Sequence, residues 1–452
     1  MDIHSTTLSP SNSIISGDGL SSLKQPLLSH HGHCEPSMPR METHKEETME
    51  NQSSQQPLQQ APTGTTFLRT CFNGLNALSG VGILSIPYAL SEGGWLSLVF
   101  LFIIAVACNY TGLLLKRCMD AHRLVKTYTD IGELAFGYKG RAMVALFMYL
   151  ELYLVAAEFL ILEGDNLEKL FPNKNFQLGS LTIGGKQGFV LVAALLILPT
   201  TWLRNLGLLA YVSAGGVLAS IIVVGCVAWA GAVDGVGFHE SGKLLNWAGL
   251  PTAISLYAFC YCGHAVFPTL CTSMKDRSQF PKVLVICFIL CTLNYGSMAV
   301  LGYLMYGEGL KSQVTLNLPV GKISSKIAIY TTLVNPFTKY AIMITPIAAA
   351  IEDWFPFRNS RPISLLIRTV LLISNVVVAL TIPFFAYLMA FIGAFLSVVV
   401  SLLLPCICYL KIFKSSRSFN LELVIICGIL VLGIIVAVLG TYTSLRQIAE
   451  HL

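Results

Sequence analysis

Charged residues are scarce in this chain. Asp, Glu, Lys and Arg make up 12% of the 452 residues, whereas apolar residues make up 54% and the mean hydropathy is +0.68. Soluble proteins carry about 25% charged residues, so the composition predicts an all-α polytopic protein of the lipid bilayer. The net charge of +5 is small and divided among the loops, which argues against nucleic acid as a partner.

Signals for catalysis, cofactor binding and metal binding are also missing. No loop contains a His/Asp cluster, a nucleophile motif or a glycine-rich cofactor loop, so we expect neither an enzyme nor a cofactor. Almost all of the thirteen cysteines lie in apolar runs, which is unlike a disulfide framework. Cys260 and Cys262, like Cys406 and Cys408, lack the spacing and neighbouring histidines of a zinc site, and no metal is expected.

Residues 1–65 contain no apolar run long enough for a signal peptide. They are rich in Ser, Gln, His, Pro and Glu, which predicts a disordered tail that stays in the cytosol, where the chain was made. Loop charge supports this orientation, because sixteen Lys and Arg residues fall in loops on the side of the tail and eight on the other side.

Apolar segments fill most of the remaining chain. Each is long enough to cross most or all of about 30 Å of hydrocarbon, and short polar turns separate them. They predict about eleven transmembrane helices within residues 66–443, followed by a short C-terminal tail at 444–452. The expected spans are residues 67–90, 95–115, 142–162, 188–203, 206–232, 251–269, 283–305, 327–350, 365–382, 384–410 and 421–442.

The first span carries its own break, because Gly80, Gly82 and Pro87 lie inside it. Non-helical backbone is tolerated in a bilayer only where protein or a water-filled cavity satisfies its N–H and C=O groups. The sixth span is broken in the same style, since Gly263 precedes Pro268 by five residues, as Gly82 precedes Pro87. One such spacing could also arise by chance, because both residue types are common in membrane helices.

The two breaks lie five spans apart, so the second enters the membrane from the opposite side. This arrangement predicts two inverted five-helix repeats, at about residues 66–232 and 251–410, with an extra helix at 421–442. Each break leaves unpaired N–H and C=O groups at mid-membrane depth. Because N–H groups suit a carboxylate and C=O groups suit an ammonium or another cation, an α-amino acid is the expected ligand.

Three glutamates lie in or near the third expected span. Glu151 and Glu158 are seven residues apart and share a helical face, and Glu163 follows. Ionisable residues at membrane depth are costly and are functional candidates by default. Glu158 and Glu163 could instead lie near the outer water, and Glu151 could pair with a loop arginine.

Lys339 and His264 are further ionisable residues inside spans. Lys339 lies about midway along the eighth span, too deep to reach the surface comfortably, and could form a fixed ion pair with a carboxylate such as Glu151. His264, beside the second break, could relay a proton or could be a neutral histidine hydrogen-bonded to loosened backbone. Gly393, Ser397 and Ser401 are spaced four residues apart. This spacing is typical of a face on which helices pack rather than of a binding site.

Five stretches carry a resemblance to a known family: GLNALSGVGILSIPYAL at 74–90, the turn TYTDIGELAFGYKGR at 127–141, WLRNLGLLAYVSAGGVLAS at 202–220, FCYCGHAVFPTL at 259–270 and NPFTKYAIMITP at 335–346. The chain resembles the amino acid/auxin permease family, and within it the vacuolar amino acid transporters of plants and fungi. The similarity covers residues 66–443. Five stretches in the right order make it more specific than any single motif.

The resemblance implies an eleven-helix fold similar to LeuT, amino acid substrates and, usually, proton coupling. Cys262 stands where a smaller hydroxyl is expected in the family, which leaves side-chain selectivity open. Carried over residue by residue, the family's substrate site consists of Ser79, Gly80, Val81 and Gly82 of the first break and Cys260, Tyr261, Cys262 and Gly263 of the sixth span.

The resemblance also gives Lys339 a role, since Lys339 matches the family's lysine after Pro-x-Thr. In folds similar to LeuT, sodium sits between first-span carbonyls and the eighth span, so an ammonium from that span could act as a built-in cation. Its deprotonation would free the carbonyls and couple protonation to the conformational change. Glu151 and His264 are the other candidate coupling residues.

The expected function is therefore proton-coupled secondary transport of neutral amino acids across the vacuolar membrane. A plasma-membrane amino acid or auxin carrier is the alternative within transporters. From another class, the protein could be an amino acid sensor that uses the same pocket and signals through its tail. A channel is disfavoured, because the polar groups converge at one depth rather than lining a continuous pore.

Overall fold

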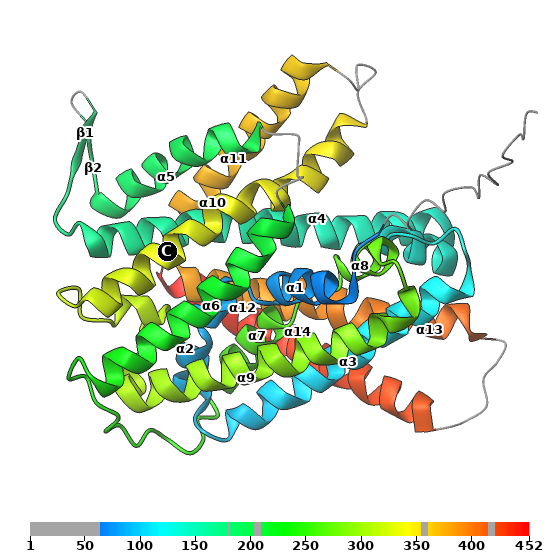
Figure 1. Cartoon of the computed structure of the whole chain (residues 1–452), viewed down its shortest axis with the longest axis horizontal. Coiled ribbons are helices and arrows are strands. Elements are labelled where there is room, and N and C mark those ends of the chain that lie inside the picture. Colours follow the sequence, from blue (N-terminus) through cyan, green and yellow to red (C-terminus); the bar gives the residue numbers. More distant parts are fainter. Residues whose placement is uncertain (1–63, 179–180, 203–208, 354–359, 415–420, 452) are drawn as a thin grey trace, which may run out of the picture. The chain divides into compact units, whose positions relative to one another are not determined.

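The computed structural model (Figure 1) describes residues 64–178, 181–202, 209–353, 360–414 and 421–451. Almost all of the predicted tail, residues 1–63, lies outside the described part of the chain. Within it helices dominate, as the composition predicts. The α-helices are α1 (Phe67–Leu78), α2 (Ile86–Gly93), α3 (Ser97–Ala121), α4 (Tyr128–Leu170), α5 (Gly185–Thr201), α6 (Leu209–Ala232), α7 (Leu250–Cys260), α8 (Phe267–Ser273), α9 (Phe280–Tyr306), α10 (Ile323–Glu352), α11 (Arg361–Thr381), α12 (Phe385–Phe391), α13 (Leu404–Ile412) and α14 (Leu421–His451).

Shorter elements connect or interrupt these helices. One antiparallel hairpin, in which Phe176 lies opposite Ile183, precedes α5. The shorter elements are the 3₁₀ turns η1 (Val81–Leu84), η3 (Arg277–Gln279), η4 (Gly307–Gly309) and η5 (Val314–Leu316), the π-helical segments η6 (Ile392–Ser397) and η7 (Val399–Leu403), and the strands β1 (Phe176–Leu178) and β2 (Leu181–Ile183).

The described helices group into eleven candidate membrane crossings, the number predicted. Seven continuous helical stretches are long and apolar enough to span a bilayer, namely α3, α4, α6, α9, α11, the run from α12 to α13, and α14. The 30-residue α10 and the shorter apolar α5 add two more crossings. The first and sixth crossings are broken: α1, η1 and α2 form one, and α7 and α8 form the other.

Proline and a local cap define the broken crossings. The Thr66 side chain accepts a hydrogen bond from the Arg69 N–H and begins α1. Pro87 and Pro268 lie in the first turns of α2 and α8, where a missing N–H costs nothing and the fixed φ suits a helix start. The Gly-x4-Pro spacing therefore marks the point at which each second half-helix begins. Residues 261–266 between α7 and α8 are non-helical.

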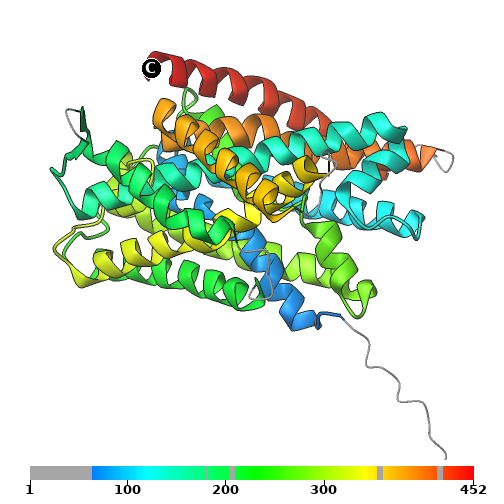
Figure 2. The same ribbon diagram turned by 90° about the horizontal axis from the view of Figure 1, so that it is seen from above.

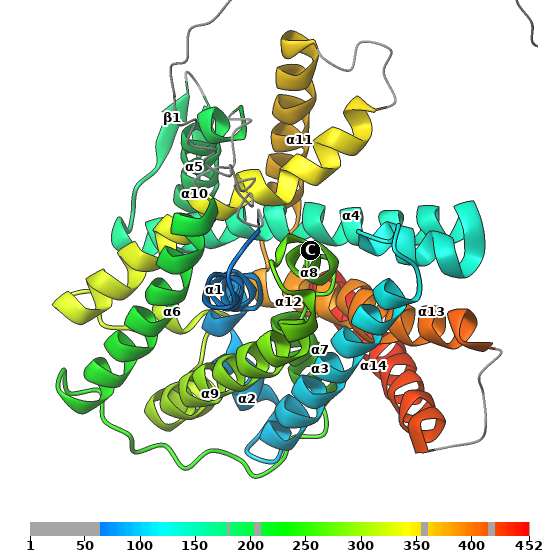
Figure 3. The same cartoon turned by 45° about the vertical axis from the view of Figure 1, so that its right-hand side comes forward.

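The two broken crossings lie among the other helices. α1 packs against α9 and α6, and α2 packs against α9 and α7, while α7 also contacts η6. Figure 3 shows α1, α7 and α8 between α4 on one side and α9 and α3 on the other. Figure 2 shows α14, in red, along one edge of these helices, where it packs on α12 and α7.

The α4 region differs from the prediction. The segment 127–141 was expected to be a turn, but it is helical from Tyr128 and is merged with the following span across a kink at Gly137. Gly137 has φ +66°, which glycine adopts without strain. The two arms of the kink pack closely, since a Cβ on Gly140 would lie 2.1 Å from the Gly132 carbonyl oxygen. Apolar length does not predict this part of the helix, because polar residues interrupt the sequence before Gly137.

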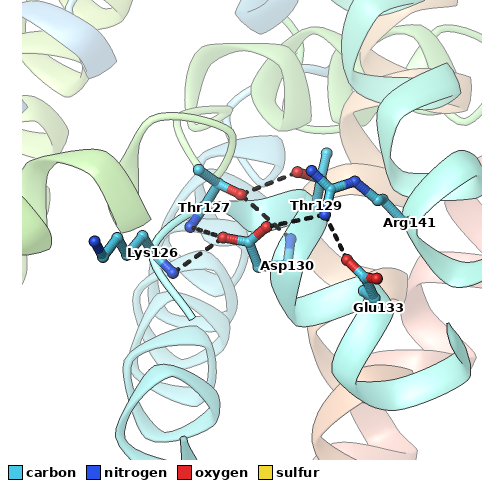
Figure 4. A network of polar contacts seen from close by, with 6 residues as sticks. All are labelled: Lys126, Thr127, Thr129, Asp130, Glu133 and Arg141. Carbon is cyan, nitrogen blue, oxygen red and sulfur yellow. Dashed lines mark hydrogen bonds and ion pairs between the residues drawn. The ribbon is translucent and has the colours of Figure 1, made fainter. Parts of the chain in front are cut away.

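Figure 4 shows the polar network that starts this helix. The Thr127 hydroxyl accepts from the Asp130 N–H at 3.3 Å, and the Asp130 carboxylate accepts from the Thr127 N–H at 2.9 Å. This reciprocal capping box satisfies N–H groups at the helix start. Arg141 forms ion pairs with Asp130 and Glu133 across the kink. The network therefore fixes the angle between the two arms of α4.

The chain also ends differently from the prediction. Residues 444–452 were expected to form a short tail, but α14 continues as a helix to His451. Ser444 is fully buried in it and donates to the Gly440 carbonyl at 2.6 Å. Apolar length predicts a helix end at residue 442, because the last two turns of the helix are polar.

Candidate functional site

A cavity of about 200 Å³ lies between the two broken crossings. Pockets of about 300–1,000 Å³ hold drug-sized ligands, so this cavity suits a smaller molecule. Its polar lining residues are Asn73, Asn76, Glu151, Cys262, Tyr295 and Lys339. Its apolar lining includes Leu152, Val155, Phe159, Phe259, Ile342 and Met343.

Most of the predicted substrate residues line this cavity. They are Gly80, Val81 and Gly82 from the first break and Cys260, Cys262 and Gly263 from the sixth crossing. Ser79 and Tyr261 do not line it. The Ser79 hydroxyl instead hydrogen-bonds the Ser220 hydroxyl of α6 at 2.6 Å, and the Tyr261 hydroxyl donates to Thr292 of α9 at 2.9 Å. The structure thus gives these two residues a role in anchoring the breaks to neighbouring helices.

Glycine allows the two broken crossings to approach each other. A Cβ on Gly82 would lie 2.6 Å from the Cys260 sulfur, and one on Gly263 would lie 3.0 Å from a Leu78 methyl group. Both distances are shorter than van der Waals contact, so larger residues would push the crossings apart. By contrast, a Cβ on Gly80 would have no neighbour closer than 4.0 Å.

Lys339 of α10 reaches the end of α1. Its ammonium donates to the carbonyl oxygens of Asn76 at 3.2 Å and Ser79 at 3.0 Å, and the side chain is 4% exposed. These carbonyls belong to the last turn of α1, where the helix offers no N–H partner. The ammonium therefore lies on first-crossing carbonyls, where the built-in cation was predicted, while its role in coupling stays a prediction. No ion pair joins Lys339 to Glu151 among the described residues, so the fixed-pair alternative is wrong.

Glu151 of α4 lies between the sixth crossing and the π-helical segment η6. Its Oε1 accepts a hydrogen bond from the Cys262 thiol at 2.8 Å and another from the Ser397 hydroxyl at 2.6 Å. The Ser401 hydroxyl in turn donates to the Cys262 sulfur at 3.4 Å. The alternative in which Glu151 pairs with a loop arginine is therefore wrong.

The packing interpretation of Gly393, Ser397 and Ser401 is only partly correct. Gly393 does pack, since a Cβ there would lie 2.0 Å from the Ser255 carbonyl oxygen. The two serines instead hold Glu151 and Cys262. Such π-helical turns often occur at functional sites, and the wider turn here is not readable from residue spacing.

Tyr295 of α9 joins the two breaks and was missed by the sequence analysis. Its hydroxyl lies within hydrogen-bond distance of the carbonyl oxygens of Leu78, in the first crossing, and Cys260, in the sixth. A phenol has one proton, so it donates to these two acceptors in turn or shares the proton between them. A tyrosine within an apolar run was the only available signal.

His264 lies outside the cavity. It is fully buried against α3, where its Nε2 is 2.9 Å from the Thr111 hydroxyl and 3.1 Å from the Cys108 carbonyl oxygen. Contact with a carbonyl requires Nε2 to donate, which fixes the tautomer. The buried Nδ1 has no hydrogen-bond partner among the described residues, so a second proton would have no acceptor, and the neutral, backbone-bound histidine is favoured over a proton relay.

Glu158 and Glu163 are both fully buried. Their carboxyl oxygens have no hydrogen-bond partner among the described residues. Their side chains are therefore shielded from solvent, and the alternative that they lie at the depth of the outer water stays a prediction. Neither residue lines the cavity.

The arrangement can bind a small zwitterion. Broken helices supply backbone groups of both polarities, and the apolar wall from α4 and α10 can enclose a side chain. The two charged residues that face the cavity are each held by neutral partners rather than by each other. Each can therefore change protonation without breaking an ion pair.

Comparison with other sequences agrees with this chemistry. The family described as "Transmembrane amino acid transporter protein" matches residues 63–446. The chain is 57% identical over 386 residues to "Amino acid transporter AVT1I" of Arabidopsis thaliana, covering 85% of this chain and 95% of that protein. It is 52% identical to "Amino acid transporter AVT1J" (85% and 92% covered) and 47% identical to "Amino acid transporter AVT1B" (86% and 72%), both from Arabidopsis thaliana.

Two solved structures share the fold at low sequence identity. One is a Na+-coupled sialic acid symporter in a substrate-bound outward-open state, with a TM-score of 0.54, 12% identity and coverage of 83% of this chain and 89% of the other. The second is MhsT in complex with L-phenylalanine, with a TM-score of 0.54, 14% identity and coverage of 85% and 99%. The predicted architecture similar to LeuT, with inverted repeats and broken first and sixth helices, is confirmed.

Proposed function

We propose a transport function on the basis that this chain belongs to the transmembrane amino acid transporter family. In this proposal the protein carries neutral amino acids across the vacuolar membrane, either in exchange for protons or together with them. A member of this family is a transporter and not an enzyme. Neutral substrates, proton coupling and the vacuolar location are our proposals.

The lining of the cavity supports neutral substrates. A cationic or anionic side chain would need a free counter-charge, because burying an unpaired charge is costly. Lys339 and Glu151 are already engaged, by carbonyls of α1 and by Cys262 and Ser397 respectively. The same two helices, α4 and α10, also supply apolar side chains to the lining of the cavity. The side chain of the substrate would therefore meet apolar groups, while its ammonium and carboxylate would meet the broken backbone.

The hydrogen bonds from Lys339 to the carbonyls of Asn76 and Ser79 carry the proposal of proton coupling. Charge-assisted hydrogen bonds are roughly twice as strong as neutral ones. Protonated Lys339 would thus hold the last turn of α1, and loss of the proton would loosen it. Because α1 borders the cavity, a proton and a substrate would bias the same conformational change.

A vacuolar location is supported by resemblance rather than by geometry. The stretches that resemble vacuolar transporters of plants and fungi run through the whole transmembrane region. A plasma-membrane carrier remains the competing location. A fluorescent fusion that labels the vacuolar membrane supports the proposal, and one that labels the plasma membrane overturns it.

Transport by the purified protein in liposomes tests the substrate and the coupling. Labelled neutral, acidic and basic amino acids would be offered in sodium-free buffer with an imposed pH gradient. We expect a neutral amino acid to accumulate and its accumulation to collapse when a protonophore is added. Uptake that requires sodium, or that ignores the pH gradient, contradicts the proposal.

A further inference from the structure

Three carboxylic acids follow one another at intervals of seven residues along α4: Glu151, Glu158 and Asp165. Seven residues make almost two turns, so the three share one helical face, with a rise of about 10 Å between neighbours. The row runs from the cavity to the end of α4 that the loop charges place on the side away from the cytosol. The third member, Asp165, lies beyond the span expected from apolar length, residues 142–162.

The middle member, Glu158, has no partner. Its side chain is fully buried, and neither carboxyl oxygen meets a hydrogen-bond donor among the described residues. An ionised carboxylate in such a place is too costly to persist, so Glu158 carries a proton in this conformation. Val155 and Phe159, on either side of Glu158 in α4, both line the cavity, whereas Glu158 does not. Glu158 therefore lies on the helix that forms the cavity wall, behind its lining side chains.

Asp165 occupies the far end of the row. It forms an ion pair with Lys186 of α5, and it accepts a hydrogen bond at 2.9 Å from the amide of Gln313, in the loop between η4 and η5. The Asp165 side chain is 11% exposed, so this end of the row lies near water.

Glu151 occupies the cavity end of the row. It is bound by Cys262 of the sixth crossing and Ser397 of η6, and Lys339 lines the same cavity from α10. A proton that reaches Glu151 is therefore in contact with the sixth crossing through Cys262 and lies in the lining of the cavity that Lys339 also faces. The row thus joins the far side of the membrane to the substrate cavity.

We propose that Asp165, Glu158 and Glu151 form a proton path along α4 and that Glu158 is its obligatory relay. Glu158 passes its proton to ionised Glu151 and is reprotonated by Asp165, so that Glu158 is a carboxylate only during the transfer. Asp165, the ionised member at the far end, takes each new proton from hydronium, which leaves as water. Each step breaks one O–H bond and forms another, so nothing is oxidised or reduced. The steps exceed direct hydrogen-bond reach, and water that enters when the far side opens bridges them.

This inference rests on the proposed proton coupling. One set of measurements distinguishes failure of the proton path from failure of the proton coupling itself. Glu158→Gln retains the shape of the neutral carboxylic acid but cannot pass a proton on. Glu163→Gln is the matched control, because Glu163 is on the same helix, equally buried and equally unpartnered, but about 140° away around the helix. Each variant in liposomes would be assayed for substrate exchange without a pH gradient, for accumulation driven by a pH gradient, and for proton flux with a pH-sensitive dye.

We expect Glu158→Gln to exchange substrate at the wild-type rate while its proton flux and accumulation fall at least tenfold. Glu163→Gln should match the wild type in all three assays. Wild-type proton flux in Glu158→Gln, or an equal loss in Glu163→Gln, overturns the path. A wild-type protein that ignores the pH gradient would instead refute the proposed function.

A second variant covers the case in which Glu158→Gln does not fold. Glu158→Asp keeps the carboxyl group and shortens its reach by one methylene. Proton flux that falls several-fold, with substrate exchange unchanged, supports the relay. Flux equal to that of the wild type overturns it.

Discussion

The first and sixth crossings are broken in the same way but held in different ways. In the first break, backbone carbonyls accept hydrogen bonds from side chains of other helices, with Lys339 on Asn76 and Ser79 and Tyr295 on Leu78. In the sixth, the side chains of the break reach outward, as Tyr261, Cys262 and His264 contact Thr292, Glu151 and Thr111. A cation holds the first break, and a carboxylate holds the second.

The two inverted repeats are therefore held by different contacts. In the proposed coupling, a change in protonation at Lys339 would act on the α1 backbone, whereas a change at Glu151 would act on a thiol in the sixth crossing and on η6. Both groups line one cavity. A substrate there would contact both crossings at once, which lets two protonation sites bias one conformational change.

Filling the space between the first and sixth crossings with larger side chains should have the largest effect on substrate binding. Gly82→Leu and Gly263→Leu would place side chains where a Cβ alone already lies 2.6 Å from the Cys260 sulfur or 3.0 Å from Leu78. We expect both variants to insert in the membrane and to lose substrate binding in a labelled-ligand assay. Gly296→Ala in α9, where a Cβ would have nothing within 4 Å and which does not line the cavity, is the control and should bind normally. Normal affinity in either leucine variant would refute the paired breaks.

Removing one hydrogen bond to the Glu151 carboxylate, at the second break, should have an intermediate effect on stability and transport. Ser397→Ala leaves Glu151 with the Cys262 thiol as its remaining donor, and loss of one such hydrogen bond costs about 1–2 kcal/mol of stability. We expect a lower unfolding temperature and slower transport. Ser401→Ala, which removes only the 3.4 Å contact to Cys262, should cost less. Equal losses would show that the serines act only through helix packing.

Removing the histidine of the second break should have the smallest effect on transport. His264 packs against Phe267 at a centroid distance of 4.8 Å and bonds Thr111, away from the cavity. His264→Asn should therefore lower thermal stability but leave the pH dependence of transport unchanged. A shifted pH profile with normal stability would restore His264 as a coupling residue.

The sequence predicted the architecture well because the constraints of the bilayer are simple. Apolar length set the number of crossings, and Gly82, Pro87, Gly263 and Pro268 marked both breaks, because backbone at that depth can leave the helix only where a cavity or protein satisfies it. The first arm of α4 was missed because its polar residues give no apolar run, and the kink depends on the positive φ of Gly137.

The details of the site were harder to predict. The placement of Lys339 on first-span carbonyls was anticipated through a resemblance to folds in which a cation sits there, not from the spacing of residues. Ser397 was assigned to packing because a four-residue interval in an ordinary helix gives no hint of a π-helical turn facing Glu151. Tyr295 was overlooked because one hydroxyl in an apolar helix carries no pattern, although it touches both breaks.

Replacement of Lys339 tests the central claim that a built-in cation on α1 couples protons to transport. In liposomes, Lys339→Met should still exchange substrate across the membrane but should no longer concentrate it with a pH gradient. Lys339→Arg, which keeps the charge but cannot release a proton, should fail to concentrate substrate as well. Proton-driven accumulation by folded Lys339→Met at the wild-type level would contradict the account.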